Sequence, residues 1–220
     1  GYYAGGIVGN AGVDISIQEC CNEGYVVSNE TGGNFGGICG TLGAGARIED
    51  SVNIGRIGTT KFGYSGGLCG MQYGTIRRSY NLGSTPQTAH TTTGISAPGA
   101  FAAMKGDEGK TEYSYFSLDK LPVQYLYGKD FVESPGVEID RTVRSSVDGC
   151  IVSSGGISGG DFSNPKMLLT WDFTNIKTYD KKFSTDFPIP VSIRKLVTKY
   201  EGSKKSSGSG SSKGTDHFYL

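Results

Sequence analysis

Short groups of apolar residues separated by glycines recur along the first half of the chain. Two glycines are followed by an aliphatic residue, then Val or Cys and a third glycine; a lone Ile and an Asn-x-Gly segment come later. The pairs begin at Gly5, Gly36 and Gly66, which gives a period of 31 and then 30 residues. Glycine at this spacing breaks helices and favours short strands joined by turns. The pattern therefore predicts a β-solenoid, in which each repeat is one coil and equivalent residues stack about 4.8 Å apart.

The repeat also predicts which side chains meet between coils. Two interior aliphatic columns and one asparagine ladder are expected, namely Ile7–Ile38–Leu68, Ile17–Ile48–Ile76 and Asn22–Asn53–Asn81. Amide side chains in such a ladder can bond from coil to coil. The glycines two residues after each Asn, Gly24, Gly55 and Gly83, are expected at turn positions with positive φ.

Charged residues follow the same register. Glu19 and Asp50 align with Arg78, and Gln18 and Glu49 align with Arg77, so acidic groups of two coils face basic groups of the third. On an exposed face each pair contributes about 0–1 kcal/mol. The alignment favours a ladder that fixes register.

The predicted fold class is all-β, a right-handed parallel β-solenoid (β-helix) of three to four coils. Residues 1–99 form the repeats, and a weaker fourth block is expected from Gly94 to Leu118. Residues 100–198 are expected to form a degenerate repeat and an irregular cap, with strands at 121–128 and 137–143 and a short helix at Pro165–Leu169. Residues 199–220 form a flexible Ser/Gly/Lys tail.

The first repeat follows directly after the N-terminal Gly1-Tyr2-Tyr3-Ala4, with no capping segment before it. An open solenoid end exposes strand edges that can pair with other strands. We therefore expect either a fragment of a longer solenoid or a first coil that pairs with another chain.

The composition restricts the classes of partner that the sequence predicts. Lys plus Arg and Asp plus Glu are 21 each, so no net field favours nucleic acid or an anionic membrane. No apolar run approaches the ~20 residues of a membrane span, and no signal peptide is recognised. Glycine accounts for 36 of 220 residues, more than twice the usual ~7%.

The five cysteines do not form a metal-binding pattern, because no C-x-x-C pair is present. Cys39 and Cys69 occupy the same repeat position and would stack on adjacent coils. That spacing permits a disulfide, but free buried thiols are favoured because Cys is among the most buried residue types. No metal or cofactor is expected.

Two serines, Ser65 and Ser158, match the nucleophile pattern G-x-S-x-G. That pattern needs a following helix and a later His, whereas His90 lies in a polar loop and His217 in the tail. Hydrolase chemistry is not expected there.

Three carboxylates are the other candidates for chemistry. The neighbouring Glu19 and Asp50, with Asp14, leave open a polysaccharide-cleaving or cation site, although the structural ladder is favoured. The tyrosines offer a hypothetical glycan platform, but Tyr80 aligns with Cys21 and Val52, so no regular aromatic column is expected.

The motif GG-(I/L)-(V/C)-G followed by I-x-x-(C/S)-x-N-x-G resembles the GLUG-motif repeats of bacterial secreted and surface proteins. The resemblance covers Gly5 to about Thr85, and NPKMLLTWDFTN with DFPIP is similar to the segment that closes such arrays. It implies a parallel β-solenoid, an extracellular or cell-surface location and no catalysis of its own, so no enzyme is expected. The implied role is adhesion or spacing, with host glycans, matrix proteins or neighbouring domains as partners. A polysaccharide-binding or polysaccharide-cleaving β-helix and a self-assembling fibre subunit are the alternatives.

Overall fold

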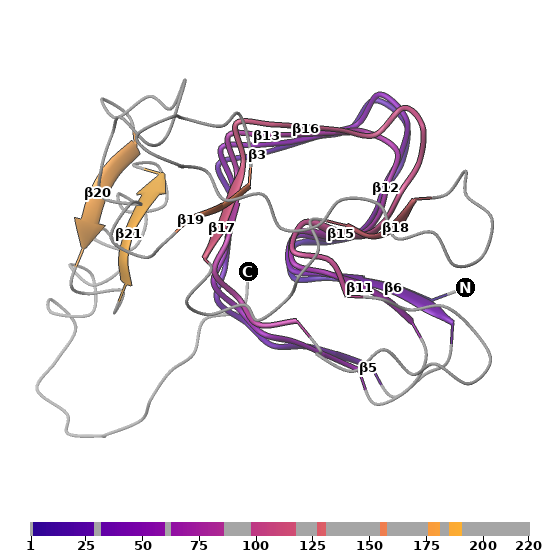
Figure 1. Cartoon of the computed structure of the whole chain (residues 1–220), viewed down its shortest axis with the longest axis horizontal. Helices are drawn as coiled ribbons and strands as arrows, with labels where there is room; N and C mark the ends of the chain where they lie inside the picture. The colour runs from indigo at the N-terminus through magenta and orange to yellow at the C-terminus, as the bar shows by residue number, and fades with distance from the viewer. Residues whose placement is uncertain are drawn as a thin grey trace, which may run out of the picture.

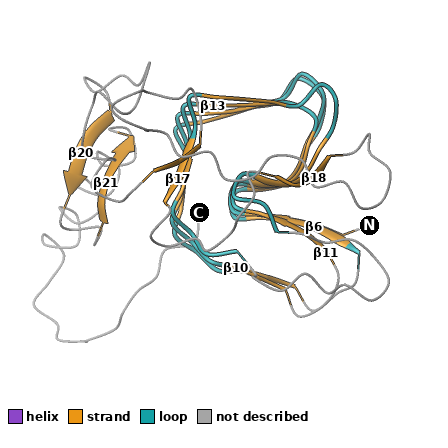
Figure 2. Ribbon diagram, in the orientation of Figure 1, coloured by secondary structure: helices purple, strands orange, loops and turns teal. Residues whose placement is uncertain are grey.

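The computed structural model describes residues 2–28, 32–59, 63–85 and 98–117, with further strands at 127–130, 155–157, 176–180 and 185–190. Within these residues the regular structure is entirely strand, as Figure 2 shows. None of the described residues forms a helix that is long and apolar enough to cross a membrane. The strands stack in parallel, which confirms the predicted β-solenoid.

Each coil contributes a set of short strands. The first coil contains β1 (Tyr2–Gly5), β2 (Val8–Ala11), β3 (Ser16–Gln18), β4 (Cys21–Asn22) and β5 (Val26–Ser28). The second contains β6 (Gly33–Gly36), β7 (Cys39–Leu42), β8 (Arg47–Glu49), β9 (Val52–Asn53) and β10 (Ile57–Thr59). The third contains β11 (Gly63–Gly66), β12 (Cys69–Gln72), β13 (Thr75–Arg77) and β14 (Tyr80–Asn81). The fourth contains β15 (Ala102–Lys105), β16 (Lys110–Glu112) and β17 (Tyr115–Ser117).

Equivalent strands of successive coils pair in parallel and in register. The sheet orders are β1-β6-β11, β18-β15-β12-β7-β2, β16-β13-β8-β3, β19-β17-β14-β9-β4 and β10-β5. Two of these sheets continue into β18 (Tyr127–Asp130) and β19 (Gly155–Ile157), while β20 (Ile176–Asp180) and β21 (Thr185–Pro190) form a separate antiparallel pair. Figure 1 shows the coils lying over one another.

Within a coil the chain doubles back, so that β6 contacts both β7 and β5 (Figure 1). The Gly-Gly-x-x-Gly motif makes this arch possible. A Cβ at Gly36 would overlap the backbone of Cys39 and Cys69, and one at Gly37 would overlap the Asn53 amide. A Cβ at Gly40 would lie 2.7 Å from the Asn34 carbonyl oxygen. The three glycines therefore allow the two arms of the arch and the neighbouring coil to pack backbone against backbone.

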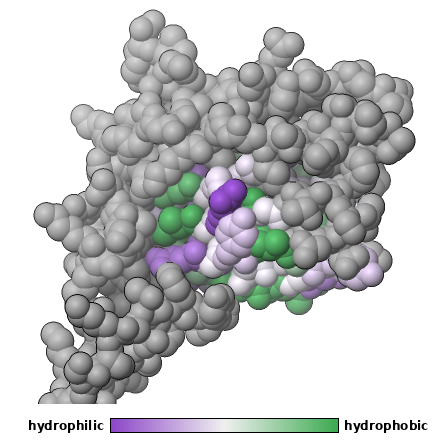
Figure 3. Space-filling model, turned by 90° about the horizontal axis from the view of Figure 1, so that it is seen from below, coloured by the Kyte–Doolittle hydropathy of each residue, from purple (hydrophilic) through white to green (hydrophobic). Residues whose placement is uncertain are grey.

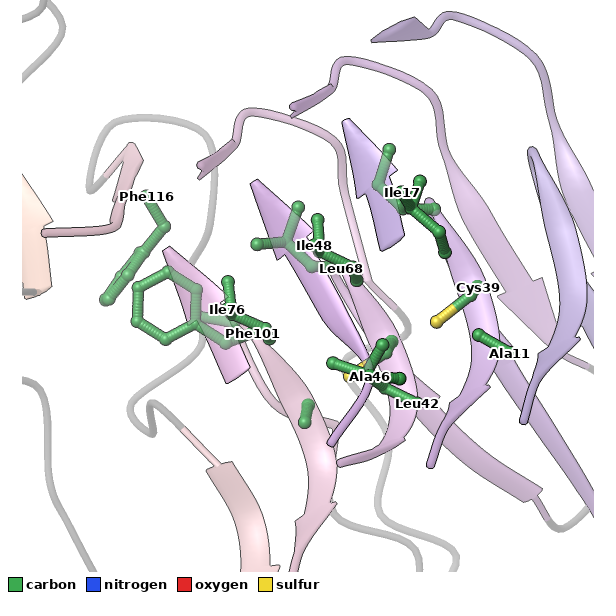
Figure 4. Packing of buried hydrophobic residues seen from close by; sticks show 14 residues of the cluster. Ala11, Ile17, Cys39, Leu42, Ala46, Ile48, Leu68, Ile76, Phe101 and Phe116 are labelled. Carbon is green, nitrogen blue, oxygen red and sulfur yellow. The ribbon is translucent and has the colours of Figure 1, made fainter. Parts of the chain in front are cut away.

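The core is a set of aliphatic columns along the solenoid axis (Figure 4). Ile17, Ile48 and Ile76 are register partners, as predicted, and all three are buried. The fourth coil adds aromatic residues: Phe101 and Phe116 meet edge to face with ring centroids 5.7 Å apart. Large rings at this level bury much apolar area in a coil where the repeat is degenerate.

The asparagine ladder is also confirmed. Asn22 Nδ2 donates to Asn53 Oδ1 at 2.8 Å, and Asn53 Nδ2 donates to Asn81 Oδ1 at 2.8 Å. The ladder ends at the fourth coil, where Phe116 replaces Asn and the Asn81 amide donates to the Ala100 carbonyl. Each amide is thus satisfied without water, as buried polar groups require.

A second polar column was not anticipated. Backbone N–H groups of Cys20, Ser51 and Ser79 each donate to the serine hydroxyl of the next coil, at 3.1, 3.2 and 3.2 Å. Each hydroxyl donates in turn to a carbonyl two residues earlier in its own coil. The Ser in the repeat motif is therefore a connector between coils.

The predicted positive φ at Gly24, Gly55 and Gly83 is wrong. Among the described residues the glycines with positive φ are Gly32 and Gly45. Crowding by the preceding coil explains the glycines of the second and third coils instead, because a Cβ at Gly55 would lie 2.6 Å from Asn22 Nδ2 and nearer still to the Gly24 carbonyl oxygen. The position needs glycine for space rather than for conformational freedom.

Two further expectations concern the later part of the chain. The described part of the fourth coil begins with Gly99, which bridges to Gly66, whereas Gly94, where this block was expected to begin, lies outside the described residues. The predicted helix at Pro165–Leu169, the predicted strand at 137–143 and the tail at 199–220 lie outside the described residues.

Candidate functional site

Two of the acidic candidates, Glu19 and Asp50, lie in a turn column between the third and fourth strands of each coil. Glu19, Asp50 and Arg78 all adopt left-handed backbone conformations, with φ of 51°, 49° and 45°. Such φ values cost non-glycine residues about 1 kcal/mol or more. Arg78 offsets this cost through two charge-assisted bonds, from Nε to Asp50 Oδ1 at 2.6 Å and from Nη2 to Asp50 Oδ2 at 2.7 Å.

The column one residue earlier in each coil carries further charges, and we call these two columns together the ridge. Gln18 Nε2 donates to Glu49 Oε2 at 3.0 Å, and Arg77 Nε lies 3.8 Å from Glu112 Oε2. Arg77 also lies over the Tyr113 ring, 6.0 Å from its centroid. The charges on Asp50, Glu49, Arg77 and Arg78 therefore interact with neighbouring coils.

The structure separates Asp14 from the other carboxylates. Asp14 precedes β3 and lies over Gly45, whereas Glu19 follows β3 at its other end. In the described ranges no three His, Cys, Asp or Glu side chains come together in a way that could hold a metal ion.

Ser65 lies inside strand β11 and is buried. A short turn and then strand β12 follow it, where a nucleophile elbow would need a helix. Its Oγ has no hydrogen-bond partner among the described atoms. Ser158, His90 and His217 lie outside the described residues.

The cysteines of the core are free thiols. Cys39 and Cys69 are register partners, both fully buried and unbridged, as favoured from the sequence. Burial and a side-chain hydrogen bond with Cys39 raise the pKa of Cys69 well above its usual value. Burial, aided by Glu23 and Cys20, raises the pKa of Cys21 to about 12. These thiols therefore remain protonated and unreactive near neutral pH.

The register expected for Tyr80 is confirmed, since it follows Cys21 and Val52. In the fourth coil Tyr115 pairs with Tyr80, and both rings are buried. Another set of tyrosines lies at the open end of the arch. Tyr3 on β1 and Tyr64 on β11 are both register partners of Asn34 on β6.

Facing this row is a second one on the other arm of the arch. Asn10, Thr41 and Met71 are register partners on β2, β7 and β12. Asn34 Nδ2 donates to Thr41 Oγ1 at 2.8 Å, which joins the two rows. We call Tyr3, Tyr64, Tyr73, Asn10, Thr41 and Met71 the arch surface.

Tyr73 follows β12 and lies near the phenols of the facing row. Burial raises its pKa, and the neighbouring Tyr3 and Tyr64 hydroxyls act in the same direction. Sequence reasoning missed the arch surface, although Tyr3 and Tyr64 both stand two residues before a Gly-Gly pair.

Other exposed aromatic residues lie outside the arch surface. Tyr25, 55% exposed, precedes β5 and lies under the Arg56 guanidinium, 5.4 Å from it. In the view from below, hydrophobic and hydrophilic residues alternate over the described face (Figure 3).

Comparisons of the chain with family models, curated proteins and solved structures gave no match.

Proposed function

We propose that this chain is a non-catalytic extracellular repeat domain of a bacterial surface or secreted protein, which serves adhesion or spacing. The observation that carries the proposal is the use of its polar side chains. The asparagines, the serines and the Asp50–Arg78 pair all bond from one coil to the next. Groups used in this way hold a rod in register and are not available for chemistry.

The motif supports the location and the family. Its glycines, Ile column and Asn ladder resemble GLUG repeats, in which such coils form extracellular arrays. A rod built this way gains about 4.8 Å for each coil, so repeat number sets the distance at which a neighbouring domain is presented.

A panel of glycans and host matrix proteins, with mass spectrometry of each bound ligand, tests the proposal. Binding without product supports adhesion, and no binding supports spacing. Turnover of any ligand would contradict the proposal. In that event Glu19→Ala and Asp50→Asn, singly and together, would show whether the ridge carboxylates perform the cleavage.

A self-assembling fibre subunit is the second candidate. The large hydrophobic side chains that are exposed in the described residues all belong to the first coil: Tyr2, Tyr3, Val13, Ile15, Tyr25 and Val27. Each strand of that coil also lies at the edge of its sheet, where its free backbone groups can pair with another strand.

Light scattering at rising protein concentration distinguishes the two candidates. A mass that grows without limit supports a fibre, whereas a constant monomer mass supports the adhesin or spacer. Asp14, Glu19 and Glu23 lie on this coil, and no Lys or Arg precedes Arg47. Two identical first coils would therefore repel, and pairing between them would end at a dimer, so growth of a fibre requires the first coil to pair with a different surface of the next copy.

A further inference from the structure

We propose that the arch surface binds a neutral glycan, with sugar rings stacked on Tyr64 and Tyr73 and sugar hydroxyls bonded to Asn10 and Thr41. This inference deepens the proposed adhesion function and rests on it. It assigns the ligand class and the residues that would recognise it.

The arch surface has the geometry of a platform for a polymer. Its two rows run along the solenoid axis, with equivalent side chains about 4.8 Å apart on adjacent coils. Tyr3 and Tyr64 are two coils apart on one arm, and Tyr73 lies on the other arm. A chain of sugars lying along this axis would meet rings and polar groups in turn.

The chemistry of the six residues favours a neutral ligand. They carry phenol, amide, hydroxyl and thioether groups and no charge. A sugar presents apolar C–H faces and hydroxyl edges, which match aromatic faces beside hydrogen-bonding groups. The closest ion pair of the coils, between Asp50 and Arg78, lies instead at a different turn.

The side chains are both accessible and ordered. Tyr3 is 49% exposed and Asn10 is exposed, while Tyr64 and Tyr73 are half-buried. Thr41 is held by Asn34. Half-buried tyrosines lose little conformational entropy when a ligand stacks on them, because packing has already restricted their rotamers. By contrast Tyr80 and Tyr115 are fully buried and serve the core.

The test uses the full 220-residue chain and neutral oligosaccharides of β-linked glucose, N-acetylglucosamine, mannose and galactose, at several lengths, measured by titration calorimetry. We expect at least one series to bind, with affinity that rises with length. Affinity should be equal in low and high salt, because no charge is neutralised.

Variants locate the binding. Tyr64→Ala and Tyr73→Ala should each weaken it about tenfold, since stacking contributes of the order of 1 kcal/mol or more. Tyr73→Phe keeps the ring and should bind nearly as well as the original chain. Tyr25→Ala removes an exposed tyrosine outside the arch surface and should change nothing. Asn10→Ala, at an exposed position that cannot disturb the core, should weaken binding about two- to tenfold.

The inference is overturned if no neutral glycan binds, or if only charged glycans bind and do so in a salt-dependent way. It is also overturned if the substitutions of Tyr64, Tyr73 and Asn10 leave the affinity unchanged. Those results leave the proposed non-catalytic role standing. Turnover of a bound glycan would instead overturn that role, while the tyrosine variants would still decide the binding surface.

Discussion

Asn53 shows how much one side chain does in this fold. It is fully buried, accepts from Asn22, donates to Asn81 and also donates to the Gly55 carbonyl at 3.1 Å. Removing its amide would leave buried groups on both neighbouring coils short of a partner. The residue therefore couples three coils.

We expect Asn53→Ala to lower the free energy of unfolding by about 2–4 kcal/mol, because two intercoil bonds are lost and their partners are left buried. Urea denaturation measures this. The same change at the exposed Asn10 is the matched control and should cost less than about 0.5 kcal/mol. Equal costs at the two positions would contradict a structural role for the ladder.

Gly55 tests the steric explanation of the glycine positions. Its φ is not in the left-handed region, yet a Cβ there would overlap the Gly24 carbonyl oxygen. Gly55→Ala should cost about 1–3 kcal/mol, as overpacking does. Gly12→Ala should be nearly neutral, since nothing lies within 4 Å of a Cβ there. Thermal and urea unfolding of both variants measure these costs, and equal costs at Gly55 and Gly12 would contradict the steric explanation.

At the scale of the element, the turn column and the column beside it each hold an ion pair between coils, and the two pairs differ in strength. Arg78 and Asp50 have side chains only 20% and 24% exposed and meet through two bonds. Arg77 and Glu112 are 40% and 44% exposed and lie 3.8 Å apart. Solvent screening weakens the second pair more than the first.

A double-mutant cycle with Asp50→Asn and Arg78→Gln should give a coupling energy of about 1–2 kcal/mol that falls in 1 M salt. These substitutions keep side chains of similar size at left-handed positions. A parallel cycle with Arg77→Gln and Glu112→Gln is the control and should give less than about 0.5 kcal/mol. A larger coupling in the control would refute the ranking.

At the scale of the molecule, buried thiols make stability sensitive to alkaline pH. The folded state holds the Cys21 proton up to a pKa of about 12, and Cys69 is also shifted upward, whereas both thiols ionise near pH 9 in the unfolded chain. The stabilisation that the two protonated thiols give the folded state is complete below pH 9. It is lost as the pH rises towards 12, because in that range the thiols ionise in the unfolded chain but not in the folded one, which favours unfolding.

We expect the unfolding free energy to fall by about 1–3 kcal/mol between pH 8.5 and pH 11, measured in urea under reducing conditions. Cys21→Val and Cys69→Ala should reduce this slope, because each variant carries the apolar residue found at the same position in another coil, Val52 and Ala102. An unchanged slope in the double variant would show that other groups cause the loss.

Much of the solenoid could be predicted from the sequence, because the Gly-Gly, Ile and Asn positions repeat at a constant period and each has one packing role. The recurrence of Gly24, Gly55 and Gly83 was predicted for the wrong reason, since the crowding of Gly55 and Gly83 by the preceding coil is invisible in one repeat. The arch surface was missed because Tyr3 and Tyr73 come from different arms of the fold. Only the doubling back of each coil brings those arms together.

The hydrogen bonds between coils also bear on how the chain changes in length over evolution. Every coil presents to the next nearly the same series of donors and acceptors, so a duplicated copy of residues 36–65 inserted before Gly66 would find matching neighbours on both sides. Like carboxylates would meet at two positions of the ridge, where a second Glu49 and a second Asp50 would lie beside the first. Gene duplication can therefore lengthen the rod by whole units, and a compensating change at each of these two positions would restore the charge balance.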